Sequence, residues 1–260
     1  MIATLAARAR LPNPLILLAV AAAWLVAVLA EATGGRSVLH HDSLIHGGLP
    51  LWAALVLFLL AWQVMIAAMM LPSSLPLITL FTRISSAQPN ARLAKAAFLY
   101  GYVWVWTAFG AIAFVGDIGI HAAVHAWPWL AAHSWLIPGG VLLMAGAFQF
   151  SPLKDACLKQ CRNPGVFLLG RYRRGPGAAF RLGREHGLFC LGCCWALMLL
   201  SFAAGVANLA WMAVLTLIML FEKTGARGDR GVVPIGVGLL LLGALVLAHP
   251  AWLPPLFAAA

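Results

Sequence analysis

The chain has 260 residues, of which 63% are hydrophobic and only 9% are charged, and its formal net charge at pH 7 is +10. One water-soluble core of this size cannot bury so much apolar side chain, which excludes an ordinary soluble domain and favours a membrane protein. A helix needs roughly 17 to 25 apolar residues to cross the hydrocarbon core, and runs of about this length recur along the chain.

Seven apolar runs predict an all-α fold, a polytopic bundle of transmembrane helices that forms a single membrane domain over residues 1–260. The runs are residues 15–30, 51–71, 96–116, 135–150, 188–204, 209–221 and 232–248. Because the sixth run is short and lies close behind the fifth, six spans are the alternative. A signal peptide at the N-terminus is disfavoured by the length of the first run and by the poor cleavage site at 29–32; its removal would also leave six spans.

Basic residues gather in the segments that a seven-span bundle places on one side of the membrane. They lie at positions 8–10, 83–95, 154–184 and 223–230, and Arg36 is the exception. Since basic loops stay in the cytoplasm, the N-terminus is predicted inside a bacterial inner membrane, with 151–186 as a basic cytoplasmic loop between spans four and five. A charge confined to one face predicts contact with anionic lipid and not with nucleic acid.

The five cysteines fall into two groups that both lie at the predicted cytoplasmic face. Cys157 and Cys161 are four residues apart, and the second group is Cys190, Cys193 and Cys194. Residues four apart share one face of a helix, so the thiols of each group can converge on one ion. Thiolates are soft ligands that suit Cu(I), Zn²⁺ or an iron–sulfur centre. The spacing therefore predicts a metal site.

These cysteines have two alternative roles. Free cysteines often serve as small buried packing residues, but two groups at helical spacing in a basic environment favour metal binding. A disulfide is disfavoured because the predicted side is the reducing cytosol. Gly192, within the second group, permits close approach of another backbone.

Methionines near the cysteines favour copper as the metal, with zinc as the second possibility. Met69 and Met70 end the second apolar run just before Pro72, and Met198 lies four residues after Cys194. Thioethers bind Cu(I) but compete poorly for harder ions. The alternative role is packing, because methionine commonly fills gaps between helices.

Histidines lie mainly in the segments predicted outside. His121 and His125 have the spacing of a helical metal pair, and Asp42 and Asp117 could add oxygen ligands. A periplasmic entry site for a divalent metal is one interpretation, and an ordinary interfacial role near tryptophans is the other. Three further histidines lie in the first outside loop: His40, His41 and His46.

Several short motifs carry a resemblance to a known family. They are Ala-Met-Met-Leu-Pro at 68–72, Gly-Ala-Phe-Gln at 146–149, Pro-Leu-Lys-Asp-Ala-Cys-Leu-Lys-Gln-Cys-Arg-Asn-Pro at 152–164, Gly-Leu-Phe-Cys-Leu-Gly-Cys-Cys-Trp-Ala-Leu-Met at 187–198, Trp-Met at 211–212 and Glu-Lys at 222–223. Over roughly residues 51–223 the chain resembles a bacterial family described as predicted metal-binding integral membrane proteins. The resemblance implies a metal-binding membrane protein in which the five cysteines and Met69-Met70 are the marked positions.

Two functions remain open from the sequence. The first is transport or delivery of a soft metal, most simply copper, through a Cys/Met site, with a metallochaperone or metalloenzyme as a further partner. The alternative is a membrane thiol–disulfide oxidoreductase that uses the same cysteines. Only Cys190-Leu-Gly-Cys193 has a dithiol spacing, and the reducing face disfavours this chemistry, so a binding protein is preferred over an enzyme.

Overall fold

A computed structural model describes residues 14–33, 49–203 and 208–250, and within these ranges the chain is all-helical, without strands. Each apolar run lies in a helix over its described residues, apart from Trp135, Gln149 and Phe150 at the ends of the run at 135–150, which confirms the all-α prediction. The helices are α2 (Pro14–Ala32), α5 (Leu51–Ser85), α6 (Ala91–Ala126), α7 (Pro128–Ala132), α8 (Leu136–Phe148), α9 (Pro152–Arg162), α10 (Pro164–Arg171), α11 (Pro176–Ala203), α12 (Leu209–Thr224) and α13 (Gly228–Ala248).

Four of these helices, α2, α5, α6 and α13, are long and apolar enough to cross a membrane. The pair α8 and α9 adds a fifth if it counts as one span, although its two helices are bent by 66°. α8 has 13 residues and α12 has 16, so at a rise of about 1.5 Å per residue they extend only about 20 and 24 Å. The described helices thus give four or five candidate spans, and both the predicted seven and the inside N-terminus stay predictions.

The basic segment 151–186, predicted as a cytoplasmic loop between two spans, contains α9, α10 and the first part of α11. α9 and α10 begin at Pro152 and Pro164, where a missing N–H costs nothing and the fixed φ suits a helix start. The Ser151 side chain caps α9 by accepting a hydrogen bond from the Leu153 N–H at 3.2 Å. α9 is short and carries four charges, and α10 has only eight residues, so neither stands out as an apolar run.

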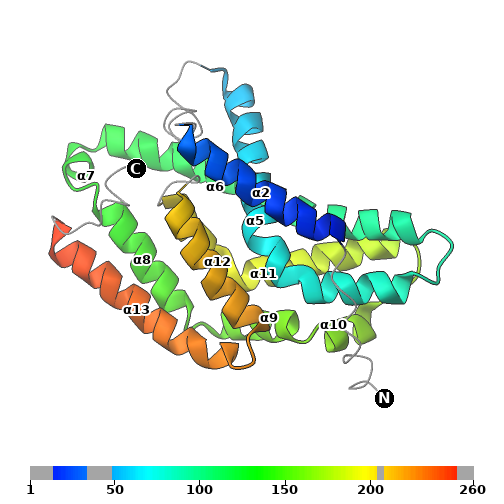
Figure 1. Ribbon diagram of the computed structural model, residues 1–260. Helices are drawn as coiled ribbons and strands as arrows, with labels where there is room; N and C mark the ends of the chain where they lie inside the picture. Colours follow the sequence, from blue (N-terminus) through cyan, green and yellow to red (C-terminus); the bar gives the residue numbers. More distant parts are fainter. Residues whose placement is uncertain (1–13, 34–48, 204–207, 251–260) are drawn as a thin grey trace.

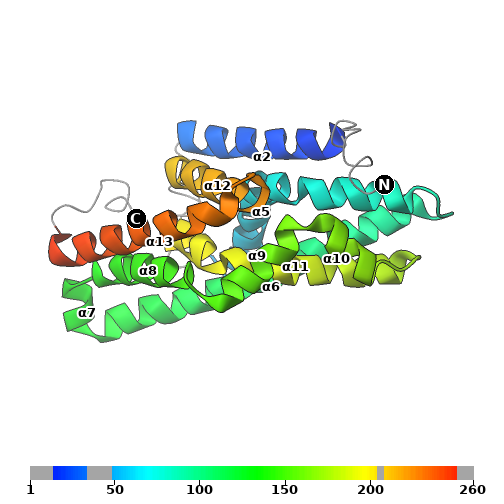
Figure 2. The same ribbon diagram turned by 90° about the horizontal axis from the view of Figure 1, so that it is seen from below.

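The helices pack as an elongated bundle (Figure 1). α11 lies along α6, α13 lies along α8, and α9 packs on α11. α2 covers one side of the bundle over α5 and α12, as Figure 2 shows. α5 bends in its middle, where Pro72 and Pro76 interrupt the helical hydrogen bonds (Figure 1). This bend places the two halves of α5 against different neighbours.

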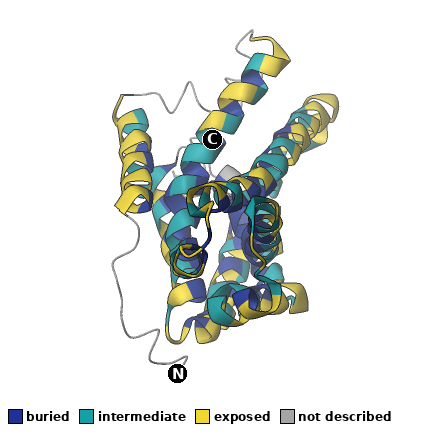
Figure 3. Ribbon diagram, turned by 90° about the vertical axis from the view of Figure 1, so that its right-hand side faces the viewer, coloured by how far each residue is buried: buried dark blue, intermediate teal, exposed yellow. Residues whose placement is uncertain are grey.

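Buried residues gather toward the centre, while exposed ones cover the outer faces of the peripheral helices (Figure 3). On α2 the exposed side chains are apolar: Leu15, Leu18 and Leu25 are 70%, 64% and 58% exposed. Such a surface is unfavourable in water and favourable in hydrocarbon. The outer faces are therefore compatible with insertion in a membrane.

Glycines set the close packing of α6 on α11. A Cβ added at Gly101 would collide with the Phe180 carbonyl and the Arg184 backbone N of α11, whereas one added at Gly116 of the same helix would meet nothing within 4 Å. We expect Gly101→Ala to destabilise the protein by about 1–3 kcal/mol. Gly116→Ala, the matched control, should be neutral or stabilise by up to about 1 kcal/mol. The midpoint of thermal unfolding measures both, and equal effects would contradict this packing.

Candidate metal centre

The cysteines lie where α5, α6, α9, α11 and α12 meet. α11 contributes Cys190, Cys193 and Cys194, each at most 1% exposed, and α9 contributes Cys157 and Cys161. All five are free thiols. The structure thus brings the two cysteine groups together from segments about 30 residues apart.

The helical spacing of the first group places both of its thiols against α11. Cys161 Sγ lies 3.9 Å from Cys193 Sγ. One turn earlier, Cys157 Sγ lies against Gly192, where an added Cβ would be only 2.5 Å from that sulfur. The predicted close approach at Gly192 is therefore present, and it lets α9 come near enough for the Cys161–Cys193 contact.

A buried lysine from α12 joins the other two thiols. Lys223 Nζ lies 3.1 Å from Cys190 Sγ and 3.7 Å from Cys194 Sγ. Met70 of α5 is also within reach, with its Sδ 3.8 Å from both the Cys194 thiol and the Lys223 ammonium. We call Cys161, Cys190, Cys193, Cys194, Met70 and Lys223 together the sulfur cluster.

Lys223 makes this cluster electrostatically unusual. Its residue is only 5% exposed, and burying an ammonium group is costly unless an opposite charge lies nearby. The adjacent Glu222 is engaged elsewhere, in an ion pair with Lys154 at 2.7 Å. Besides the Ser73 hydroxyl at 3.4 Å, the hydrogen-bond partners of Lys223 Nζ among the described residues are all sulfur atoms. A thiolate in the cluster would therefore be stabilised by Lys223, and so would an anionic metal–thiolate complex.

Hydrogen bonds extend from the cluster into the bundle. Tyr102 Oη lies 3.3 Å from Cys190 Sγ, Ser74 Oγ lies 3.2 Å from Tyr102 Oη, and His186 Nε2 lies 3.2 Å from Ser74 Oγ. His186 precedes the apolar run that begins at residue 188; burial, followed by the nearby charge of Lys223, lowers the pKa of His186 to about 3. The imidazole is thus neutral at pH 7 and serves as a hydrogen-bonding group.

A second polar contact ties the helices of the site together. Lys154 of α9 and Glu222 of α12 form their ion pair at 1% and 2% side-chain exposure. Arg162, at the end of α9, donates to the carbonyls of Glu222 and Gly225. α9 and α12 are therefore held in register next to the cysteines, with α11 between Cys161 and Lys223.

The remaining predicted metal ligands lie elsewhere. Met69 and Met198 are fully buried in the same hydrophobic core, while the thiol contact from the methionine pair is made by Met70. His121 lies 19 residues beyond Tyr102 on α6, about 28 Å along the helix axis. Its Nε2 is 3.7 Å from Asp117 Oδ1, and His125 follows one turn later. His40, His41, Asp42 and His46 fall outside the described residues.

Three residues of the site were not predicted as part of it. Lys223 was predicted in a basic loop, and Tyr102 and His186 were given no role in the site. The signal for Lys223 was its position: Glu222-Lys223 follows an apolar run directly and belongs to the motifs that carry the resemblance. Tyr102 gave no comparable signal because it is one aromatic residue in an aromatic-rich helix.

The arrangement of thiols limits the metals that fit. Among the described residues, no group of three or more His, Cys, Asp and Glu side chains is placed to hold a metal ion. Cys161 and Cys193 approach each other, and Cys194 contacts the Met70 thioether. The donors gathered here are all sulfur, a set that suits a soft metal ion.

Comparison with known proteins identifies a family. The sequence model of the PpoB2 family, described as a copper chaperone, matches residues 59–246, which include all five cysteines and Lys223. Neither a curated protein nor a solved structure matches significantly.

Proposed function

Since this chain belongs to the PpoB2 copper chaperone family, we propose that it is an integral membrane protein that binds Cu(I) at the sulfur cluster and passes it on. The observation that carries the proposal is the contact of Cys161 with Cys193, of Cys194 with Met70, and of both Cys190 and Cys194 with a buried lysine. Delivery to a copper enzyme and transport across the bilayer are both compatible with this site.

The sulfur distances support Cu(I) as cargo. Thiolates and a thioether suit a soft monovalent ion, and a thioether competes poorly for harder ions. If metal–thiolate bonds have the length known for zinc, about 2.3 Å, two ligands of a planar three-coordinate ion lie about 4 Å apart. The Cys161–Cys193 and Cys194–Met70 separations are 3.9 and 3.8 Å. Each pair is thus spaced like two ligands of one Cu(I) ion.

Lys223 is proposed to neutralise the charge of the copper–thiolate complex. A Cu(I) ion with two thiolates carries one net negative charge, and Lys223 supplies the matching positive charge in a water-poor site. Lys223→Met should lower the affinity for Cu(I) by about 10–100-fold, the range typical of groups next to the ligands. Competition with a colorimetric Cu(I) chelator measures this loss.

Lys159→Met is the matched control, because Lys159 lies on α9 and forms an exposed pair with Asp155. It removes the same charge without touching the sulfur cluster, so its affinity should stay within about twofold of wild type. Equal losses in the two variants would show that only the overall charge of the protein matters.

We also propose that the protein lies in the bacterial inner membrane with its basic segments in the cytoplasm. The support is the concentration of Lys and Arg in 83–95, 154–184 and 223–230, together with the apolar outer faces of the long helices. A reporter fused after Arg174 should therefore behave as cytoplasmic, and one fused after Ala260 as periplasmic. The opposite signal at either position would refute this orientation.

A further inference from the structure

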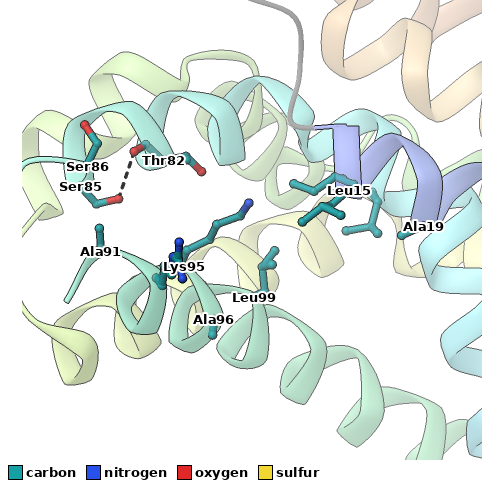
Figure 4. A pocket seen from close by; sticks show the side chains of 12 residues that line it. Leu15, Ala19, Thr82, Ser85, Ser86, Ala91, Lys95, Ala96 and Leu99 are labelled. Carbon is teal, nitrogen blue, oxygen red and sulfur yellow. Dashed lines mark hydrogen bonds between the residues drawn. The ribbon is translucent and has the colours of Figure 1, made fainter.

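A cavity of about 670 Å³ lies away from the sulfur cluster, between the start of α2, the end of α5 and the start of α6 (Figure 4). Its walls are apolar on the side of α2, with Leu15, Ala19 and Leu99 among the lining residues. Two cations, Arg92 and Lys95, line the side of α6. The cavity thus combines an apolar wall with concentrated positive charge.

The two cations have no ion-pair partner among the described residues. The other polar lining groups are hydroxyls. The hydroxyls already donate to backbone carbonyls of their own helix: Thr82 to Ile78, Ser85 to Phe81 and Ser86 to Arg83. An anion in the cavity would therefore be held by Lys95 and Arg92, with Lys95 reaching from α6 into the space between the helices (Figure 4).

We propose that this cavity binds the headgroup of an anionic phospholipid, with the upper part of an acyl chain against α2. Basic pockets between membrane helices on the cytoplasmic side take such headgroups, and each cation near the surface contributes about a fivefold gain in binding. Leu15, which lines the cavity, is also one of the exposed leucines of α2, which we treat as facing hydrocarbon. A soluble anion would leave this apolar wall unused. The inference rests on the proposed membrane insertion but not on copper binding.

The test measures lipid binding to the purified full-length protein. Native mass spectrometry monitors this binding when phosphatidylglycerol or phosphatidylcholine is added. Wild type should prefer phosphatidylglycerol by about tenfold or more. Arg92→Gln with Lys95→Gln should lose most of this preference, at about fivefold for each cation. Ala96→Trp, which keeps both cations but fills the cavity from an exposed position, should also lose it.

Arg181→Gln with Arg184→Gln is the matched control, since both residues are exposed on α11 and lie outside the cavity lining. This variant should keep the preference. If the Arg181/Arg184 variant lost the preference for phosphatidylglycerol as fully as the Arg92/Lys95 variant, the effect would come from the general positive charge of this side of the protein, and the proposal would be overturned. Equal binding of both lipids by wild type would also overturn it. A preference that emerges only after removal of residues 1–10 would show that the chain's own N-terminal segment fills the cavity, and would also overturn the proposal.

Copper binding by the Arg92/Lys95 variant, measured in parallel, should be unchanged, which separates this test from that of the proposed function.

Discussion

Replacing Cys161 and Cys193 together by serine is expected to lower the affinity for Cu(I) by more than about 100-fold. These two residues are the thiols that approach each other across the α9–α11 contact, at 3.9 Å. A hydroxyl is a hard, weakly acidic group that does not replace a thiolate as a ligand of a soft ion. The loss should therefore exceed the 10–100-fold range known for groups that only support the ligands.

Cys157→Ser is the matched control for this double variant. Cys157 is on the same face of α9, but its sulfur lies against the Gly192 backbone. We expect a loss of less than about tenfold, which competition with a Cu(I) chelator would distinguish from the double variant. A Cys161/Cys193 variant that binds copper as tightly as wild type would remove this pair from the site.

Glu222→Gln is expected to destabilise the fold by about 3–5 kcal/mol, because it leaves the Lys154 ammonium buried without a countercharge. Replacing both partners, with Lys154→Met and Glu222→Leu, should restore much of this stability, since a buried ion pair contributes little more than a well-packed apolar pair. The free energy of unfolding in a denaturant titration of the purified protein measures both variants.

The exposed pair Lys159–Asp155 provides the comparison for this experiment. Its side chains are 68% and 63% exposed, and its Nζ–Oδ2 distance of 2.6 Å is as short as that of the buried pair. Asp155→Asn should cost less than about 1 kcal/mol, because solvent screens the pair. A Glu222→Gln variant that is no less stable than Asp155→Asn would show that the α9–α12 contact does not depend on the buried charge.

The sequence predicted the helices well because their signal is local. Long apolar runs such as 51–71 and 96–116 identify helices by length alone, and the structure confirms them within α5 and α6. α9 and α10 gave no apolar run because α9 is short and charged and α10 has only eight residues, and both pack on longer helices, α9 on α11 and α10 on α5. The span count is also difficult to predict, since α8 and α12 are apolar but short.

For the site, the sequence predicted the groups of residues but not their partners. Cysteines four apart share a helix face, so the thiols of α9 could be expected to point the same way, and they do so toward α11. That Met70, rather than Met69 or Met198, contacts a thiol depends on the rotation of α5 about its axis. Lys223 could not be placed from composition, because a lysine after an apolar run ordinarily lies in solvent.

The central claim, that the sulfur cluster binds Cu(I), is tested most directly by the copper content and X-ray absorption spectrum of the purified full-length protein. We predict one Cu(I) per chain with sulfur ligands only, and no bound copper in a variant in which all five cysteines are serine. Protein that binds no copper, and instead contains a disulfide between Cys161 and Cys193, would contradict the claim and support thiol–disulfide exchange at the same residues.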